Sequence, residues 1–227
     1  MANCVIVMGY SGTGKSTSIK GLVPSETVIF NVLGKKLPFK GSAKLYNQAN
    51  TNMFQIDDYS TMIDYLLGIG ANTPTIKNVV IDDGIYIMRK EYFKRAKESG
   101  YGKYTELAQH FQSIIQTCET LRDDLNIFLM LHCEEMVSDG AIIGYQLATV
   151  GKLLLSQYNP VECVPMVLFS AIKYDDKGGA TYGFFTHRCK NGTVEIPAKT
   201  PDGMFETDFI PNDLGLVVKA MNEYYGC

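Results

Sequence analysis

Short apolar runs recur along the chain, separated by stretches in which apolar residues return every three or four positions. The continuous runs predict buried strands, because strands covered on both faces lose the alternation of half-exposed ones. They cover residues 3–8, 27–31, 78–82 and 126–132. The helical spacing predicts helices at 15–22, from Ser60 onward, at 104–124 and at 212–224. Strands that alternate with helices imply an α/β fold, with a mostly parallel sheet and helices on both faces.

Two stretches depart from this alternation. Residues 33–52 are rich in Gly, Lys and Asn and predict an exposed excursion with room for one short strand, ahead of another at 53–56. In the last third, residues 164–174, 180–188 and 193–196 predict a C-terminal antiparallel meander. Asn191-Gly192 suits a two-residue hairpin turn, because both residues tolerate positive φ.

A glycine-rich motif directly follows the first strand. Residues 9–17 read Gly-Tyr-Ser-Gly-Thr-Gly-Lys-Ser-Thr and match G-x-x-x-x-G-K-[ST] between a predicted strand and a predicted helix. Such a loop turns its N–H groups toward phosphate oxygens, and the positive end of a helix starting near Lys15 favours the same anion. Lys15 is expected to reach the β and γ phosphates, and the Ser16 hydroxyl to bind Mg²⁺. The residues assigned to the nucleotide are Gly9, Ser11, Gly12, Thr13, Gly14, Lys15, Ser16 and Thr17.

Two acidic residues end the third predicted strand. Asp82 closes this strand in the place of a Walker B acid, where it can hold Mg²⁺ directly or through water. Asp83 follows and could polarise water or orient its neighbour. The competing interpretation is a pair of acids that cap the next helix.

The fourth predicted strand ends in His132, at the carboxyl edge where open α/β sheets bind ligands. This histidine could sense the γ-phosphate, or it could be a structural residue. Glu134 and Glu135 follow, and either could activate water or be a surface acid. The catalytic candidates are therefore Lys15, Asp82, Asp83, His132 and Glu134.

Two clusters of cations carry further predictions. Arg188 and Lys190 beside the Asn-Gly turn could stabilise the γ-phosphate of a neighbouring subunit, or be an ordinary basic hairpin end. Residues 88–103 mix cations with tyrosines and a phenylalanine, which suits single-stranded DNA and equally suits a solvated helix face. The DNA-binding candidates are Arg89, Lys90, Lys94, Arg95, Lys97 and Lys103. Residues 136–150 are a second candidate DNA-facing segment.

Composition narrows these functions only slightly. The 227 residues fit a single domain over 1–227, with no domain or leader expected ahead of the motif. The net charge of −3 gives no overall attraction to nucleic acid, so any such binding must be local. No apolar run approaches a membrane span. The six cysteines form no C-x-x-C pair, which favours buried free thiols in a reducing cytoplasm.

Taken together, the motifs resemble the RecA-like P-loop ATPases of bacteriophages, of the single-strand-annealing type. The resemblance rests on residues 9–17, 79–83, 100–108, 129–132 and 199–206. It implies a phage protein, in the host cytoplasm, that forms homo-oligomers and couples ATP and Mg²⁺ to single-stranded DNA in recombination or replication. A single-strand-binding or replication protein is a candidate partner.

One position departs from that family. RecA-like relatives commonly carry a catalytic glutamate after the second strand, where this chain reads Asn31-Val32-Leu33-Gly34. Another acid replaces it, or hydrolysis is slow and the nucleotide acts mainly as a switch. Two alternative functions therefore stay open, a small-molecule P-loop kinase and a non-catalytic, nucleotide-gated scaffold. The chain has only four arginines, scattered along the sequence, and this scarcity argues against the kinase.

Overall fold

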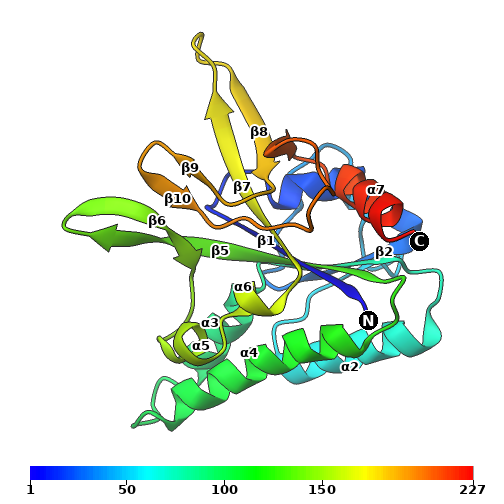
Figure 1. Ribbon diagram of the computed structural model, residues 1–227. Helices are drawn as coiled ribbons and strands as arrows, with labels where there is room; N and C mark the ends of the chain where they lie inside the picture. Colours follow the sequence, from blue (N-terminus) through cyan, green and yellow to red (C-terminus); the bar gives the residue numbers. More distant parts are fainter. Residues whose placement is uncertain (227) are drawn as a thin grey trace.

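A computed structural model describes residues 1–226 and shows a mixed α/β fold built on a mostly parallel sheet (Figure 1). The strands are β1 (Asn3–Gly9), β2 (Thr27–Asn31), β3 (Met53–Phe54), β4 (Asn78–Asp82), β5 (Asn126–Ser138), β6 (Ala141–Leu147), β7 (Met166–Tyr174), β8 (Ala180–Phe185), β9 (Cys189–Asn191), β10 (Val194–Ile196) and β11 (Phe209–Pro211). The helices are η1 (Ser16–Gly21), η2 (Pro24–Glu26), α1 (Ser42–Leu45), α2 (Tyr59–Asn72), α3 (Ile85–Lys94), α4 (Gly102–Thr120), α5 (Leu153–Gln157), α6 (Pro160–Cys163) and α7 (Leu214–Tyr225).

The main sheet runs in the order β11-β8-β7-β1-β5-β4-β2-β3. Strand β1 lies between β5 and β7 and is parallel to both, and β4, β2 and β3 continue the parallel part. At the other edge, β8 pairs antiparallel with β7, and β11 pairs antiparallel with β8, so β8 is the reversed strand there. The four apolar runs of the sequence are therefore neighbouring parallel strands, as predicted.

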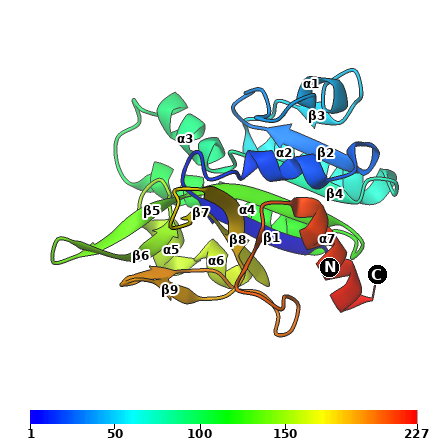
Figure 2. The same ribbon diagram turned by 90° about the horizontal axis from the view of Figure 1, so that it is seen from above.

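Helices cover both faces of this sheet, which confirms that part of the prediction. Alternate residues of β1 belong to two separate cores, with Ile6 in the larger one and Val7 in the other. Ile6 shares its core with residues of α2, α3 and α4, and Val7 shares its core with residues of η1 and α7. Figures 1 and 2 show α2 and α4 on one side of the sheet and α7 on the other.

Two helix predictions were wrong in detail. Instead of an α-helix over 15–22, the chain forms the six-residue 3-10 helix η1, because Leu22 is already extended and Pro24 follows. Its last residue, Gly21, leaves no room for a Cβ against Asp213 at the start of α7. The sequence suggests Ser60 as the N-cap of the next helix, but α2 begins at Tyr59 and is capped by Asp58, whose carboxylate accepts a hydrogen bond from the Thr61 N–H at 3.0 Å.

The excursion at 33–52 holds no strand. It contains the short helix α1 and is not fully exposed, since Leu37 and Tyr46 are buried against the core that contains Val7. Apolar residues are too few in this polar segment for a repeating pattern to identify Leu37 and Tyr46 as buried.

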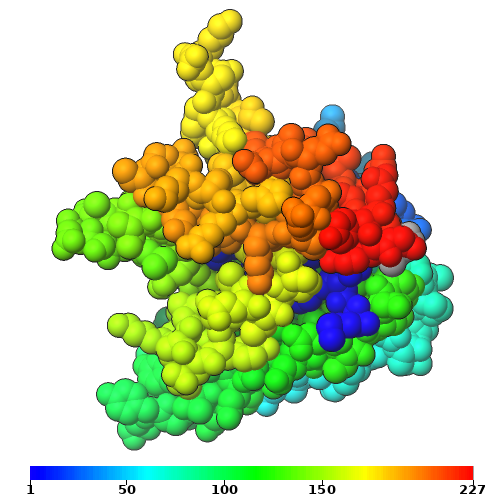
Figure 3. Space-filling view, in the orientation of Figure 1, coloured from blue at the N-terminus to red at the C-terminus, as the bar shows by residue number. Residues whose placement is uncertain are grey.

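The predicted meander is divided between two sheets. Strand β7 pairs with β1 in parallel and with β8 antiparallel, so these strands extend the main sheet. A β9–β10 hairpin forms as predicted, but Asn191 pairs with Val194, so its two turn residues are Gly192 and Thr193, and Gly192 has positive φ while Asn191 does not. Strand β10 also pairs with β6. Residues 136–150 are not a loop: β5 continues to Ser138 and folds back as β6. Figure 3 shows the β5–β6 and β7–β8 hairpins projecting from the body of the protein.

The cysteines and helices agree with the remaining expectations. Cys4, Cys118 and Cys133 are buried free thiols, Cys163 and Cys189 are partly buried free thiols, and Cys227 lies outside the described residues. Among residues 1–226, no helix has the length and apolar character needed to cross a bilayer.

Candidate functional site

Residues of four neighbouring parallel strands lie at one edge of the sheet, and most of the predicted site residues meet there. Gly9 at the end of β1 pairs with His132 of β5, and Asp82 at the end of β4 pairs with Asn31 at the end of β2. The carboxyl edge of parallel strands is where open α/β sheets bind ligands. The order β1-β5-β4-β2 therefore sets the glycine-rich loop, the histidine, the acids and the segment after β2 in one row.

The glycine-rich loop is held in shape by residues that are distant in sequence. A Cβ on Gly9 would lie 2.6 Å from the Ser170 carbonyl oxygen, and the Ser170 hydroxyl donates to the Thr13 carbonyl at 2.9 Å. Gly14 has φ +100°, and the Asn212 amide donates to its carbonyl at 2.9 Å. Strand β7 and the segment before α7 thus fix the loop. Sequence reasoning missed both residues, because neither lies in a recognisable motif.

Lys15 fills the inside of this loop. Its side chain is buried, and its ammonium donates to the carbonyls of Gly9 and Tyr10, at 2.7 Å each. Burial lowers the pKa of Lys15, because the charged form loses hydration. The loop therefore holds a partly desolvated cation within reach of the neighbouring strand ends.

Ser16 and Asp82 meet directly across the cleft. The Ser16 hydroxyl donates to the Asp82 carboxylate at 2.8 Å, over a separation of 66 residues. Asp82 is buried, and this burial raises its pKa to about 6 even though the Ser16 hydrogen bond favours the carboxylate. Two oxygen ligands suited to a hard cation thus lie side by side.

Asp83 is the second acid in the cleft. It has φ +58°, a left-handed conformation that aspartate tolerates better than most residues. Its carboxylate lies 3.1 Å from the Lys35 ammonium and 3.9 Å from His132 Nε2. Asp83 is therefore not a simple helix cap, since its side chain faces the Lys35 ammonium, from the segment after β2, and the His132 imidazole of β5.

His132 lies between the loop and the acids. Burial lowers its pKa, and the nearby Lys15 ammonium adds to the effect, so the imidazole is neutral near pH 7. The edge of Tyr86 packs against its ring, with centroids 5.8 Å apart, and its Nδ1 is buried without a hydrogen-bond partner within the described residues. A neutral imidazole at this place can form a hydrogen bond with a ligand.

These residues line a cleft of about 680 Å³. Its positive charges come from the loop side and from the segment after β2, as Lys15, Lys20, Lys35 and Lys36. Asp82, Asp83 and Asp213 are its acids, and Tyr182, Pro211 and Asn212 form another wall. Lys35 and Lys36 are absent from the sequence predictions. A Gly-Lys-Lys sequence just after a buried parallel strand could have identified these two lysines.

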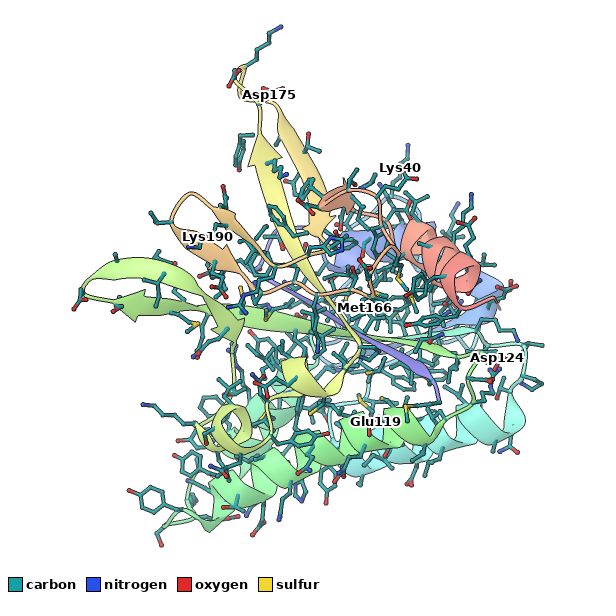
Figure 4. The ribbon with its side chains drawn as sticks, in the orientation of Figure 1. Lys40, Glu119, Asp124, Met166, Asp175 and Lys190 are labelled. Carbon is teal, nitrogen blue, oxygen red and sulfur yellow. The ribbon has the colours of Figure 1, made fainter. Side chains whose placement is uncertain are left out.

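Three other candidates are not brought to this cleft. Glu134 accepts a hydrogen bond from the Gln146 side chain at 2.8 Å and lines a different pocket, so its place does not support a catalytic role. Arg188 forms an ion pair with Glu195 in the same hairpin. Lys190 lies on β9, in the hairpin with β10 (Figure 4), and is not among the described residues that line the cleft.

The basic segment 88–103 is largely paired within the protein. Arg95 contacts three glutamates, Glu91, Glu98 and Glu106. Lys90 and Lys94 both pair with Asp57, at 3.0 and 3.8 Å. Much of its positive charge is thereby neutralised by residues of the same chain.

The remaining cations of this segment accompany aromatic rings. The Arg89 guanidinium lies 5.0 Å from the centroid of Tyr86, and the Lys103 ammonium lies 5.0 Å from that of Tyr92. Lys97 has no ion pair among the described residues. Arg89 borders a groove of about 780 Å³, which is lined by Leu33, Tyr86, Arg89, Lys90, Tyr92, Phe93, Tyr104, Thr149, Val150 and Gly151. Tyr86 separates this groove from the cleft, since its ring also contacts His132.

Comparison with models of known protein families finds no match, and no curated protein has a detectably similar sequence. The fold and the site together define a mixed α/β protein with a lysine-rich cleft at the carboxyl edge of its parallel strands.

Proposed function

We propose that this protein is a P-loop nucleoside triphosphatase of the RecA-like class and that it binds ATP with Mg²⁺ in the 680 Å³ cleft. The observation that carries the proposal is the hydrogen bond of 2.8 Å between Ser16 and Asp82, beside a buried Lys15 ammonium. A phosphate-binding loop needs a lysine for the β and γ phosphates, a hydroxyl for Mg²⁺ and an acid beside that hydroxyl. All three are present, from two different strand ends.

The donor set fits Mg²⁺ only together with a nucleotide. Within residues 1–226, no group of three or more His, Cys, Asp or Glu side chains is arranged to hold a metal ion. Mg²⁺ in nucleotide sites is typically bound by one or two protein oxygens, with phosphate oxygens and water completing the octahedron. Ser16 and Asp82 would supply the protein oxygens, and the bound ion would neutralise charge on the phosphates.

The strand order supports the RecA-like class over the kinase. Strand β5 lies between β1, which leads into the loop, and β4, which ends in the acids. This placement sets His132 between the two, where it could sense the terminal phosphate. Small-molecule P-loop kinases usually close an arginine-rich lid over the transferred phosphate, but no arginine is among the described residues that line the cleft. Arg95, Arg122 and Arg188 are each paired with carboxylates elsewhere.

Asp83 is our candidate for orienting or activating water. It is the acid of the cleft that is not bonded to Ser16, and it faces His132 and Lys35. It would take the place of the glutamate that RecA-like proteins carry after the second strand. The nucleotide-gated scaffold is the alternative if Asp83 does not support turnover.

We further propose that the protein is phage-encoded and acts as a homo-oligomer on single-stranded DNA. The groove beside Tyr86 supports the DNA-binding part, because exposed aromatic rings can stack on unpaired bases. Exposed apolar side chains on the β5–β6 hairpin support self-association, namely Met136, Val137, Ile142 and Ile143. Arg188 and Lys190 on the neighbouring hairpin stay candidates for a cation supplied to another subunit.

ATP hydrolysis by purified protein, with and without single-stranded DNA, tests this proposal. Stimulation by DNA supports the recombination-type ATPase. A rate of ATP hydrolysis that DNA does not change favours coupling to a different partner, or a kinase. ATP binding without turnover favours the scaffold, and the absence of ATP binding contradicts the proposal as a whole.

Replacing Phe93 by Ala is expected to weaken binding of single-stranded DNA by roughly fivefold or more, because one stacking surface is lost. Phe93 is 73% exposed, so the fold should tolerate the change. Fluorescence anisotropy with a labelled oligothymidylate measures the effect. Tyr174→Ala, at an exposed ring on the β7–β8 hairpin, is the matched control. Equal affinities for the Phe93 variant and the wild type contradict the assignment of the groove to DNA.

A further inference from the structure

Lys35 occupies the side of the cleft that faces the phosphate-binding loop across the acids. It follows β2, whereas the loop follows β1, and the ends of β5 and β4 lie between them. Lys35 lines the same cleft as Lys15 and Ser16. A ligand bound in the loop would therefore extend past Asp82 and Asp83 toward this second cation.

The backbone of Lys35 is fixed while its ammonium is only loosely held. The Asn31 amide donates to the Lys35 carbonyl at 2.6 Å, and the Gly34 N–H donates to the Asn31 carbonyl at 3.2 Å. Gly34 has φ +68°, which allows this tight turn. The side chain of Lys35 is 63% exposed, and its ammonium pairs with the largely buried Asp83 carboxylate at 3.1 Å and lies 5.9 Å from the centroid of Tyr86. Solvent around the exposed lysine screens this pair, so a more highly charged anion can compete with Asp83 for the ammonium.

We propose that Lys35 is a second phosphate-binding cation, which leaves Asp83 and contacts the terminal phosphate of the bound nucleoside triphosphate. This inference rests on the nucleotide-binding function proposed above and adds a residue to it. The cation comes from the same chain, so charge on the terminal phosphate is compensated without a neighbouring subunit. When Lys35 moves, the Asp83 carboxylate loses its ion-pair partner and becomes available to a water molecule at the same place.

A structural role for Lys35 makes a different prediction. If Lys35 only holds Asp83 in its left-handed conformation, its removal should affect nucleoside triphosphates and diphosphates alike. A contact to the terminal phosphate should affect only the triphosphate. The ratio of the two affinities therefore separates the two roles and does not depend on turnover.

The experiment is a titration of wild type, Lys35→Ala and Lys35→Arg with ADP and with a non-hydrolysable ATP analogue, each with Mg²⁺. Lys35→Ala is expected to lower the affinity for the ATP analogue by roughly tenfold or more, as for one lost hydrogen bond between charged groups. The affinity for ADP should fall by less than about twofold. Lys35→Arg should recover most of the loss. Lys40→Ala, which removes an exposed lysine that does not line the cleft, is the matched control (Figure 4).

The outcomes are distinguishable from failure of the proposed function. Unchanged ADP affinity shows that the Lys35→Ala variant is folded, so a selective loss of the ATP analogue supports the proposal. Equal losses for both nucleotides, or no loss for either, overturn it while leaving nucleotide binding intact. A wild-type protein that binds neither nucleotide contradicts the proposed function itself, and the role of Lys35 falls with it.

Discussion

Asp82→Asn is expected to abolish Mg²⁺-dependent nucleotide hydrolysis and, at the same time, to stabilise the fold. The carboxylate is the charged oxygen ligand we assign to Mg²⁺, and an amide cannot replace that charge. The same carboxylate is buried, and burial raises its pKa from 3.8 to about 6. An amide of the same shape can still accept the Ser16 hydrogen bond without the cost of a buried charge.

The sign of the pH dependence follows from the raised pKa. The folded protein binds the Asp82 proton more tightly than the unfolded chain, so ionisation destabilises the fold above about pH 6. This cost is relieved as the pH falls through about 6 and amounts to at most about 3 kcal/mol. Urea unfolding at pH 7.5 and pH 5 should therefore show the stabilisation by Asp82→Asn at pH 7.5 and a smaller one at pH 5. Asp64→Asn, at an exposed position of α2, is the control. A variant less stable than wild type at pH 7.5 contradicts the argument.

Lys15→Ala is expected to lower the rate of ATP hydrolysis by at least about 100-fold, because it removes the preorganised cation at the phosphates. The ammonium already lies between two loop carbonyls, of Gly9 and Tyr10, so no large rearrangement is needed to position it. Nucleotide-dependent assembly and DNA binding should be lost together with hydrolysis. Steady-state ATPase measurements and sedimentation with and without nucleotide check this result.

The exposed Lys219 on α7 provides the control, since Lys219→Ala removes the same charge far from the loop in sequence and outside the lining of the cleft. Assembly and DNA binding that survive Lys15→Ala unchanged would contradict the idea of a nucleotide-dependent switch. In that case neither assembly nor DNA binding would depend on the cleft.

The parts of the fold that local sequence determines were predicted well. Short uninterrupted apolar runs favour buried strands, and four of them are the neighbours β1, β2, β4 and β5. The glycine-rich loop and Asp82 were also found, because a short motif and a strand end specify their chemistry. Ser16 and Asp82 could be paired in advance for the same reason.

The rest of the site depends on long-range pairing that no sequence window contains. Ser170 and Asn212 reach the loop from segments more than 150 residues away in sequence. Lys35 faces the cleft only because β2 lies beside β4. In the same way, Asp57 and Glu106 neutralise cations that appear free in the segment 88–103. Strand β5 was predicted too short because its far half is exposed and carries acidic residues.

The most direct test of the account is equilibrium binding of a non-hydrolysable ATP analogue to the wild-type protein, with and without Mg²⁺. The account predicts saturable binding of one nucleotide per chain, tighter with Mg²⁺ than without it, and loss of the Mg²⁺ effect in Asp82→Asn. Absence of binding, or binding that Mg²⁺ and Asp82→Asn leave unchanged, would contradict the assignment of the cleft to a nucleoside triphosphate.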